Sequence, residues 1–156
     1  ARLATELGFK KFHWLENGGL AGDDTDAHID TLARLCPDKT ILYVKCDDPA
    51  DEHFPALHNM EDELQKLPAY SLIPLPWPKA RFDEDGNRLP ATYANFLIIN
   101  GAVLVPVYND PADSAALAAV KKAFPDREII GIDRSALILQ HGSLHCVTMQ
   151  IPKGVL

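Results

Sequence analysis

The strongest constraint on the fold is an internal repeat, in which the order strand, strand, helix, strand occurs twice along the chain. Apolar runs and turn residues predict strands at 28–35, 40–45, 71–75, 93–99, 102–107 and 128–132, with helices at 50–67 and 112–124. The two units therefore cover about residues 28–76 and 93–132. Leu42 and Leu104 lie 62 residues apart, and Leu72 and Ile129 lie 57 apart, so the units are of nearly equal size.

A further unit is predicted to begin at about 143–151, where the run HCVTMQI has the composition of a strand. Each ββαβ unit buries its faces only against neighbouring units, so a repeat of this kind belongs to an α/β architecture of packed units. We therefore expect residues 1–156 to form a single α/β domain that is part of a larger array.

The composition limits the partners of this domain. Of the 156 residues, 47% are hydrophobic, as in an ordinary globular protein, and 22 acidic against 15 basic residues give a formal net charge of −7. This charge argues against a nucleic-acid partner and favours a cationic ligand. No apolar run is long enough for a membrane span, so no membrane partner is expected. Three cysteines form an odd and sparse set, which predicts a reducing, cytoplasmic location.

The first polar cluster is the run GDDTDAHID at 22–30. If this run enters a strand, alternation places His28 and Asp30 on the same face. A histidine beside a carboxylate can act as a general acid or base, and the pair could also bind a metal ion. The structural alternative is a solvated acidic loop that leads into a strand.

The second polar cluster is the run HGSLHC at 141–146. Cys146 stands among histidines and a glycine, surroundings that suit a reactive thiolate, although packing is the alternative role. Cys36 and Cys46 have apolar neighbours and are expected to be packed. Ser143 lacks the Gly-x-Ser-x-Gly elbow of many hydrolases, so a serine nucleophile is disfavoured.

Other side chains receive structural predictions. Asn95 lies in an apolar run, and a buried amide needs hydrogen-bond partners, either within the fold or at a site. The Pro-rich stretch 74–90 predicts a long loop, of the kind that often carries function. Two side chains, His13 and Trp14, are expected to pack, and two others, His53 and His58, are expected to be solvated.

Together, the runs GDDTDAHID, YANFLIINGAVLVPVY, FPDREIIGID and GSLHCVTMQIP resemble the agmatine deiminase and bacterial (Porphyromonas-type) peptidylarginine deiminase family of the guanidine-modifying pentein superfamily. This resemblance implies an α/β propeller of five ββαβ units with the site in the central cavity. The chain would be the C-terminal part of that ring. An N-terminal half of the same fold would supply the other units and a further acidic residue.

The resemblance also implies roles for individual residues. Cys146 would attack the guanidinium carbon, His28 would protonate the departing ammonia and then activate water, and Asp30 would bind the guanidinium nitrogens. Supporting substrate contacts would come from Asn95, Asp24 and Gly142. The implied reaction converts agmatine to N-carbamoylputrescine and ammonia, with no metal and no cofactor.

Other functions stay open at this point. Peptidyl or free arginine could be the substrate and give citrulline. The chain could instead be a catalytically incomplete fragment or a non-enzymatic binding module, and a homodimer is possible. A third class is a metal-dependent hydrolase that uses His28, Asp30 and His145.

Overall fold

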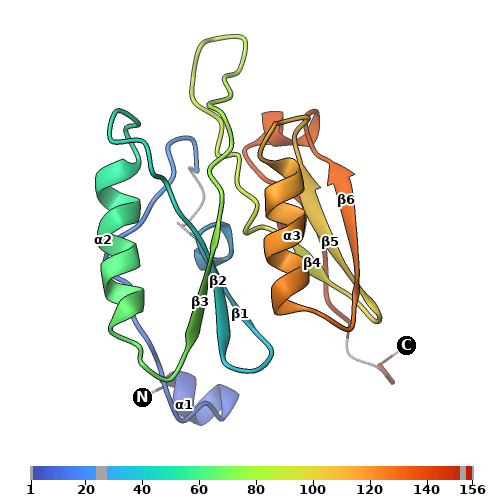
Figure 1. Ribbon diagram of the computed structural model, residues 1–156. Coiled ribbons are helices and arrows are strands. Elements are labelled where there is room, and N and C mark those ends of the chain that lie inside the picture. The colour runs from blue at the N-terminus through green and yellow to red at the C-terminus, as the bar shows by residue number, and fades with distance from the viewer. Residues whose placement is uncertain (1, 24–27, 152–153, 156) are drawn as a thin grey trace.

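Two units of the same topology make up most of the molecule. The computed structural model describes residues 2–23, 28–151 and 154–155, so Asp24 lies outside the described residues. The first unit contains β1 (Ala33–Cys36), β2 (Thr40–Val44), α2 (Phe54–Gln65) and β3 (Ser71–Leu75). The second contains β4 (Leu97–Ile98), β5 (Ala102–Val107), α3 (Asp113–Ala123) and β6 (Glu128–Asp133), as Figure 1 shows.

Strand pairing shows that the repeat is structural. In each sheet the first two strands are antiparallel, and the third is parallel to the second after a helical crossover. Ile41 pairs with Leu72 in the first sheet, and Val103 pairs with Ile129 in the second. These pairs are related by the sequence offsets that predicted the repeat.

The helix α3 joins the two units. It lies between the two sheets, whereas α2 covers the outer face of the first sheet (Figure 1). Small side chains on α3, including Ala116 and Ala119, are buried and allow close approach on both sides. Phe96 then packs edge-on against Phe124 at the end of α3, with 6.0 Å between ring centroids. The core is therefore continuous across the units.

The predicted strand at 28–35 is wrong in its first half. Residues Ile29–Thr31 form a 3₁₀ turn, η1, and the strand begins only at Ala33. The hydroxyl of Thr31 donates to the carbonyl of His28 at 2.8 Å, and this local bond competes with an extended backbone.

Two other predicted strands are also shorter or absent. The run 93–99 forms only the two-residue strand β4, because the preceding residues 93–96 are buried in an irregular conformation. The run 145–151 forms a 3₁₀ turn, η3 (His145–Val147), and no strand among its described residues. Another 3₁₀ turn, η2 (Leu137–Gln140), precedes it.

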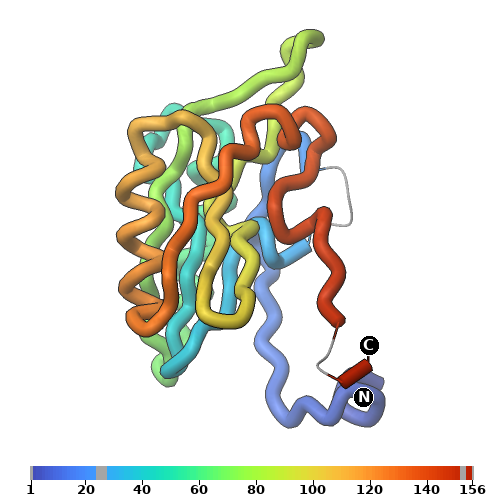
Figure 2. The backbone as a smooth tube through the Cα atoms, turned by 90° about the vertical axis from the view of Figure 1, so that its right-hand side faces the viewer, coloured from blue at the N-terminus to red at the C-terminus, as the bar shows by residue number. Residues whose placement is uncertain are grey.

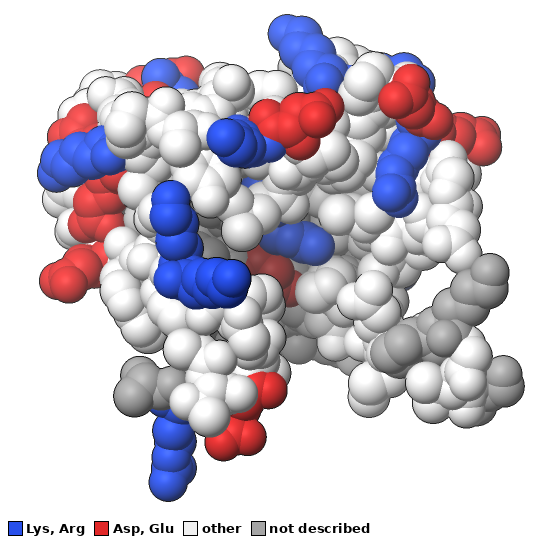
Figure 3. All heavy atoms as spheres, turned by 90° about the horizontal axis from the view of Figure 1, so that it is seen from below, with Lys and Arg blue, Asp and Glu red and all other residues white. Residues whose placement is uncertain are grey.

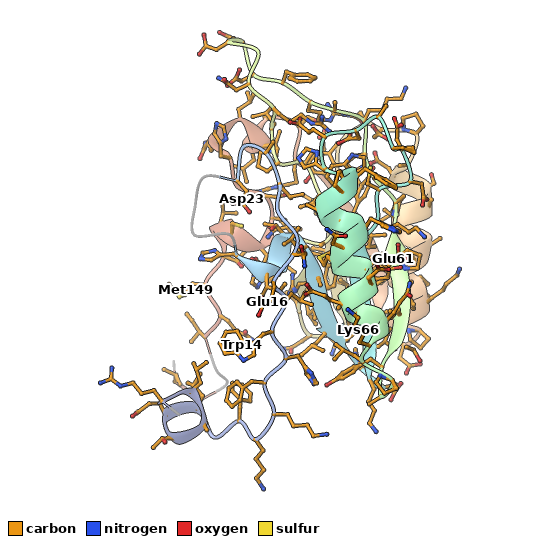
Figure 4. The ribbon with its side chains drawn as sticks, turned by 90° about the vertical axis from the view of Figure 1, so that its left-hand side faces the viewer. Trp14, Glu16, Asp23, Glu61, Lys66 and Met149 are labelled. Atoms are coloured by element: carbon orange, nitrogen blue, oxygen red, sulfur yellow. The ribbon has the colours of Figure 1, made fainter. Side chains whose placement is uncertain are left out.

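The predicted exposure of three side chains is wrong. His53 is 5% exposed rather than solvated, because its ring lies against Asp51 (2.7 Å) and Trp77. His13 is exposed rather than packed, although its ring lies edge-on to that of Tyr70. Trp14 is 75% exposed rather than packed. It follows an unpredicted helix, α1 (Arg2–Leu7). The N-terminal and C-terminal segments extend from the same end of the molecule (Figure 2), and Trp14 and Met149 come from these segments (Figure 4).

The long loop after β3 is anchored to the first unit. Asp51 Oδ2 accepts hydrogen bonds from Trp77 Nε1 and Arg88 Nη2, each at 3.0 Å. Burial alone would raise the pKa of Asp51, but these bonds and those from His53 hold it well below the usual range. The loop tip projects from the top of the molecule in Figure 1. No helix among the described residues has the length and apolarity to cross a membrane.

Candidate active site

Three segments that are distant in sequence meet at the side chain of Asn95. Asn95 is fully buried, and its Nδ2 donates to Asp30 Oδ2 at 2.9 Å and to Cys146 Sγ at 3.2 Å. Asp30 comes from η1, Asn95 from the segment before β4, and Cys146 from η3. One carboxamide therefore connects the predicted nucleophile to the predicted carboxylate.

The oxygen of the same carboxamide holds the turn that carries the thiol. Asn95 Oδ1 accepts from the backbone N–H groups of His145 at 2.8 Å and Cys146 at 3.2 Å. With donors on one side and acceptors on the other, only one orientation of the amide satisfies every contact. This use of two backbone N–H groups also explains why residues 145–147 form a turn and not a strand.

His145 is a site residue to which the sequence analysis gave only a metal-binding role. Its Nδ1 lies 2.6 Å from Asp30 Oδ2, the oxygen that also accepts from Asn95. Asp30 Oδ1 makes no hydrogen bond to any residue that the structure describes. In the sequence, the position of His145 directly before Cys146 was the feature that could have indicated a place for this histidine in the site. Among the described residues, no three His, Cys, Asp or Glu side chains are placed to hold a metal ion.

The residues that resemblance assigned to the site mostly share one cavity, which has a volume of about 540 Å³. Among them, His28, Asp30, Gly142 and Cys146 line it, while Asn95 is buried. The other lining residues are Leu137, Gln140, His141, His145, Val147 and Thr148. His28 and Asp30 reach the cavity from the start of a 3₁₀ turn, not from one face of a strand.

The wall of the cavity is tied to the loop before η1. His141 Nδ1 lies 2.8 Å from the carbonyl of Gly22. Gly22 has a φ of +81°, and a Cβ there would collide with the carbonyl of Arg88. By contrast, a Cβ on Gly142 would meet Cys146 Cβ at 3.5 Å, an ordinary contact. Space alone therefore demands glycine at position 22 but not at position 142.

The three thiols differ in their surroundings. Cys146 is exposed and lines the cavity, whereas Cys46 is buried and Cys36 is half-buried. Burial raises the pKa of Cys36 to about 11, so its thiol stays protonated at neutral pH. Of these three, only Cys146 has the access that a nucleophile needs.

Charges of both signs are interspersed over the face of the molecule that Figure 3 shows. Seen from below, acidic and basic side chains alternate around the rim, and some of each sign lie at the floor of a central hollow (Figure 3). No broad basic area covers the described part of this face, consistent with the excess of acidic residues.

Comparisons with known proteins agree on one family. Residues 1–152 match the model of the Porphyromonas-type peptidyl-arginine deiminase family. The agmatine deiminase of Pseudomonas syringae pv. tomato is 30% identical over 174 residues, which cover 97% of this chain and 47% of that protein.

Solved structures show the same fold. A C. jejuni agmatine deiminase structure is 46% identical with a TM-score of 0.87, covering 93% of this chain and 43% of that one. The structure of an Enterococcus faecalis agmatine deiminase is 26% identical with a TM-score of 0.84, and the match covers 97% of this chain and 47% of that one. The chain thus spans about half the length of the relatives it matches. On the match over residues 1–152, the chain belongs to the Porphyromonas-type peptidyl-arginine deiminase family.

Proposed function

We propose that this chain carries the catalytic half of a guanidine deiminase, with agmatine as its first substrate. The observation that carries the proposal is the bridge made by Asn95 between Asp30 and the thiol of Cys146, beside a cavity. A planar cation that rests its N–H groups on the carboxylate would bring its carbon toward the sulfur.

The chemistry begins with a poor electrophile. A guanidinium ion is stabilised by resonance, so the nucleophile must be a thiolate held close to the carbon. Asp30 Oδ2 is occupied by Asn95 and His145, and Oδ1 makes no bond to the described residues. We therefore assign Oδ1 to the guanidinium N–H groups, while the two protein donors keep the carboxylate in place.

The proton transfers are assigned to His28, which lines the cavity. Attack by Cys146 forms a C–S bond and a tetrahedral adduct. The adduct loses ammonia when the C–N bond breaks and His28 donates a proton to the nitrogen. His28 then removes a proton from water, whose oxygen attacks the same carbon. Cleavage of the C–S bond regenerates the thiolate and releases the ureido product, whose remaining O–H proton passes through water to the departed ammonia and gives ammonium.

The wider assembly is also a proposal. Following the family resemblance, residues 1–156 would be the C-terminal part of a five-unit propeller, and the segment from about residue 143 would begin a further unit. The span of about half of each relative supports a larger fold of which this chain is one part. A further guanidinium-binding carboxylate would then come from the N-terminal half of the ring. Asp24 and Gly142 keep supporting roles in this scheme.

The names of the relatives support both substrates. Two solved structures with a TM-score of 0.93, at 52% and 56% identity, are named for peptidyl-arginine deiminase and arginine deiminase, whereas other matches support agmatine. Matched proteins from two Pseudomonas species are named agmatine deiminase, and so are the C. jejuni structures, one of which has substrate bound. The family model is named for peptidyl-arginine deiminase, so peptidyl arginine is the second candidate.

The test uses the full-length protein that contains this chain. Release of ammonia and of the ureido product is measured with agmatine, free arginine and an arginine-containing peptide. We expect the highest kcat/KM with agmatine, complete loss in Cys146→Ala, and normal turnover in the matched variant Cys46→Ala. Full activity of Cys146→Ala would overturn the nucleophile assignment. Loss of activity in a strong chelator, restored by metal, would favour the metal-dependent alternative.

A further inference from the structure

Arg34 holds the backbone on both sides of Asn95. Its Nη1 donates to the carbonyl of Ala94 at 3.1 Å and to that of Phe96 at 2.7 Å. Its Cζ lies 4.6 Å from the centroid of the Phe96 ring. Arg34 is on β1 of the first unit, whereas residues 94–96 belong to the second, so the contact also crosses between units.

The segment that Arg34 holds has little regular structure to fix it. Ala94, Asn95 and Phe96 are fully buried and precede the short strand β4. Buried carbonyls outside a strand ladder need donors from elsewhere. A guanidinium offers several N–H groups in a rigid plane, so it can satisfy two carbonyls and stack on a ring at once.

We propose that Arg34 is a positioning residue for the deiminase reaction, which fixes the Asn95 carboxamide by holding the carbonyls on either side of it. Asn95 in turn sets where the thiol of Cys146 lies relative to the carboxylate of Asp30. Displacement of residues 94–96 would move both ends of this bridge. The role in catalysis rests on the function proposed above, but the effect on the thiol does not require that function.

The charge of Arg34 acts in the same direction. Burial lowers the pKa of this guanidinium, and Asp30, Cys36 and Cys146 oppose that effect, in that order. The cation therefore lies within electrostatic reach of both Asp30 and Cys146. An arginine remains charged throughout the physiological range, so its attraction to the carboxylate of Asp30 persists at every pH near neutrality.

The test compares three variants of the full-length protein. Arg34→Met removes the charge and the planar donors but keeps much of the side-chain volume, and Arg34→Lys restores only the charge. Arg127→Met is the matched control. Arg127 Nη1 also donates to a backbone carbonyl, that of Ile99 at 2.6 Å, and its Cζ lies 5.8 Å from the Phe124 ring, but it does not contact the site.

The first readout needs no substrate. Alkylation of Cys146 by iodoacetamide is followed over time at one fixed pH by peptide mass spectrometry. Cys36, whose pKa is raised to about 11 by burial, serves as a slow internal reference. We expect the alkylation rate of Cys146 to fall in Arg34→Met, because the N–H that Asn95 donates to its sulfur is displaced, to recover partly in Arg34→Lys, and to stay unchanged in Arg127→Met.

The second readout is turnover of agmatine. Misplacement of reacting groups by about 1 Å costs on the order of 100-fold in rate, so we expect a loss of that order in the kcat of Arg34→Met, with a smaller change in KM. Arg34→Lys should recover little of this kcat. If Arg34→Met does not fold, both readouts, alkylation of Cys146 and kcat with agmatine, are compared between Arg34→Lys and Arg127→Met.

Two results would overturn the positioning role. One is an alkylation rate of Cys146 and a kcat in Arg34→Met that match those of Arg127→Met. The other is full recovery of kcat in Arg34→Lys, because charge alone would then suffice. If instead the alkylation rate falls as expected while the unmodified protein does not turn over agmatine or arginine, the proposed function fails and the positioning of the thiol stands.

Discussion

Replacing Asn95 by alanine removes the side chain that joins the two halves of the candidate site. The change deletes the bond to Asp30 Oδ2 (2.9 Å), the contact with Cys146 Sγ (3.2 Å) and the bonds from two backbone N–H groups (2.8 and 3.2 Å). The backbone N–H of His145 keeps one acceptor, the carbonyl of residue 95 at 3.1 Å, because that carbonyl is unaffected by the substitution.

The expected loss in the free energy of unfolding follows from the kind of hydrogen bond that Asn95 makes to each partner. A hydrogen bond to a charged group contributes about 1.5–3 kcal/mol to stability, and the bond to Asp30 is of this kind. The bond from the backbone of Cys146 adds about 1 kcal/mol, and the N–H of His145 loses less because it keeps an acceptor. Since Cys146 is exposed, water can replace part of the loss, and we expect the free energy of unfolding to fall by about 2–3 kcal/mol.

The assay is urea unfolding followed by tryptophan fluorescence, with Asn87→Ala as the control. Asn87 Nδ2 also donates to an aspartate, Asp83 Oδ2, at 2.9 Å, but that pair is exposed. The control should therefore change stability by no more than about 0.5 kcal/mol. Amide exchange measured by NMR adds a local readout, in which protection at Cys146 should fall further than protection at His145.

Either of two outcomes would refute this reasoning. If Asn95→Ala destabilised the protein no more than Asn87→Ala, the buried carboxamide would not be the link that its contacts indicate. If protection fell equally at both amides, the carbonyl of residue 95 would not hold the N–H of His145 as the 3.1 Å distance implies.

Three further substitutions test contacts in the first unit and the loops next to it. Burial would raise the pKa of Asp51, but its hydrogen bonds lower this pKa by more than burial raises it. The ionised side chain therefore stabilises the fold above about pH 4, the pKa in the unfolded chain, and this stabilisation is lost as the pH falls toward the folded pKa. Asp51→Asn should thus lower stability at pH 7 by about 1–3 kcal/mol and flatten the acid-side loss in urea titrations at several pH values. Gly22→Ala should lower the thermal midpoint, because its Cβ would meet the carbonyl of Arg88 at a positive φ, while Gly86→Ala, whose Cβ meets nothing within 4 Å, should lower it less. Tyr43→Phe removes the 2.6 Å bond to Glu61 and should cost about 1–2 kcal/mol in urea unfolding; no loss would mean that this buried bond contributes nothing net.

The regular part of the fold follows from local pattern. Apolar runs on both sides of Asn100-Gly101 predict the β4–β5 hairpin, and in the turn Gly101 has a positive φ, +83°, whereas Asn100 does not. The helix α2 begins at Phe54, later than predicted, since Pro55 is favoured in a first turn. Periodicity identifies such elements because each repeats one spacing over several residues.

The irregular segments could not be found in that way. Residues 93–96 and 145–147 have strand-like compositions, yet their backbones follow side-chain bonds from distant residues, whereas residues 28–31 turn on the local bond from Thr31 to the carbonyl of His28. The side chains that hold the backbones of 93–96 and 145–147 lie 50 to 62 residues away along the chain, so no local pattern contains them. The same holds for His53, whose buried position depends on Asp51 and on the backbone N–H of Ala21. Identifying Cys146, Asp30 and Asn95 as candidates needed only their types and the family resemblance, whereas the role of His145 needed the geometry.

The candidate site and the contact between the two units are built from the same bonds. Thr92 Oγ1 donates to the carbonyl of Thr31 at 2.8 Å, and Arg34 holds the carbonyls of residues 94 and 96, so the segment that carries Asn95 is fastened to the first unit on both sides of that residue. Any change that separates the units must therefore also displace the thiol from the carboxylate. None of these bonded residues lines the cavity, so in the proposed reaction they would fix the reacting groups and would not meet the rest of the substrate. If that reaction is correct, discrimination between agmatine and an arginine side chain belongs to other residues, and the cavity wall at Leu137 and Gln140 is the first place within this chain to test.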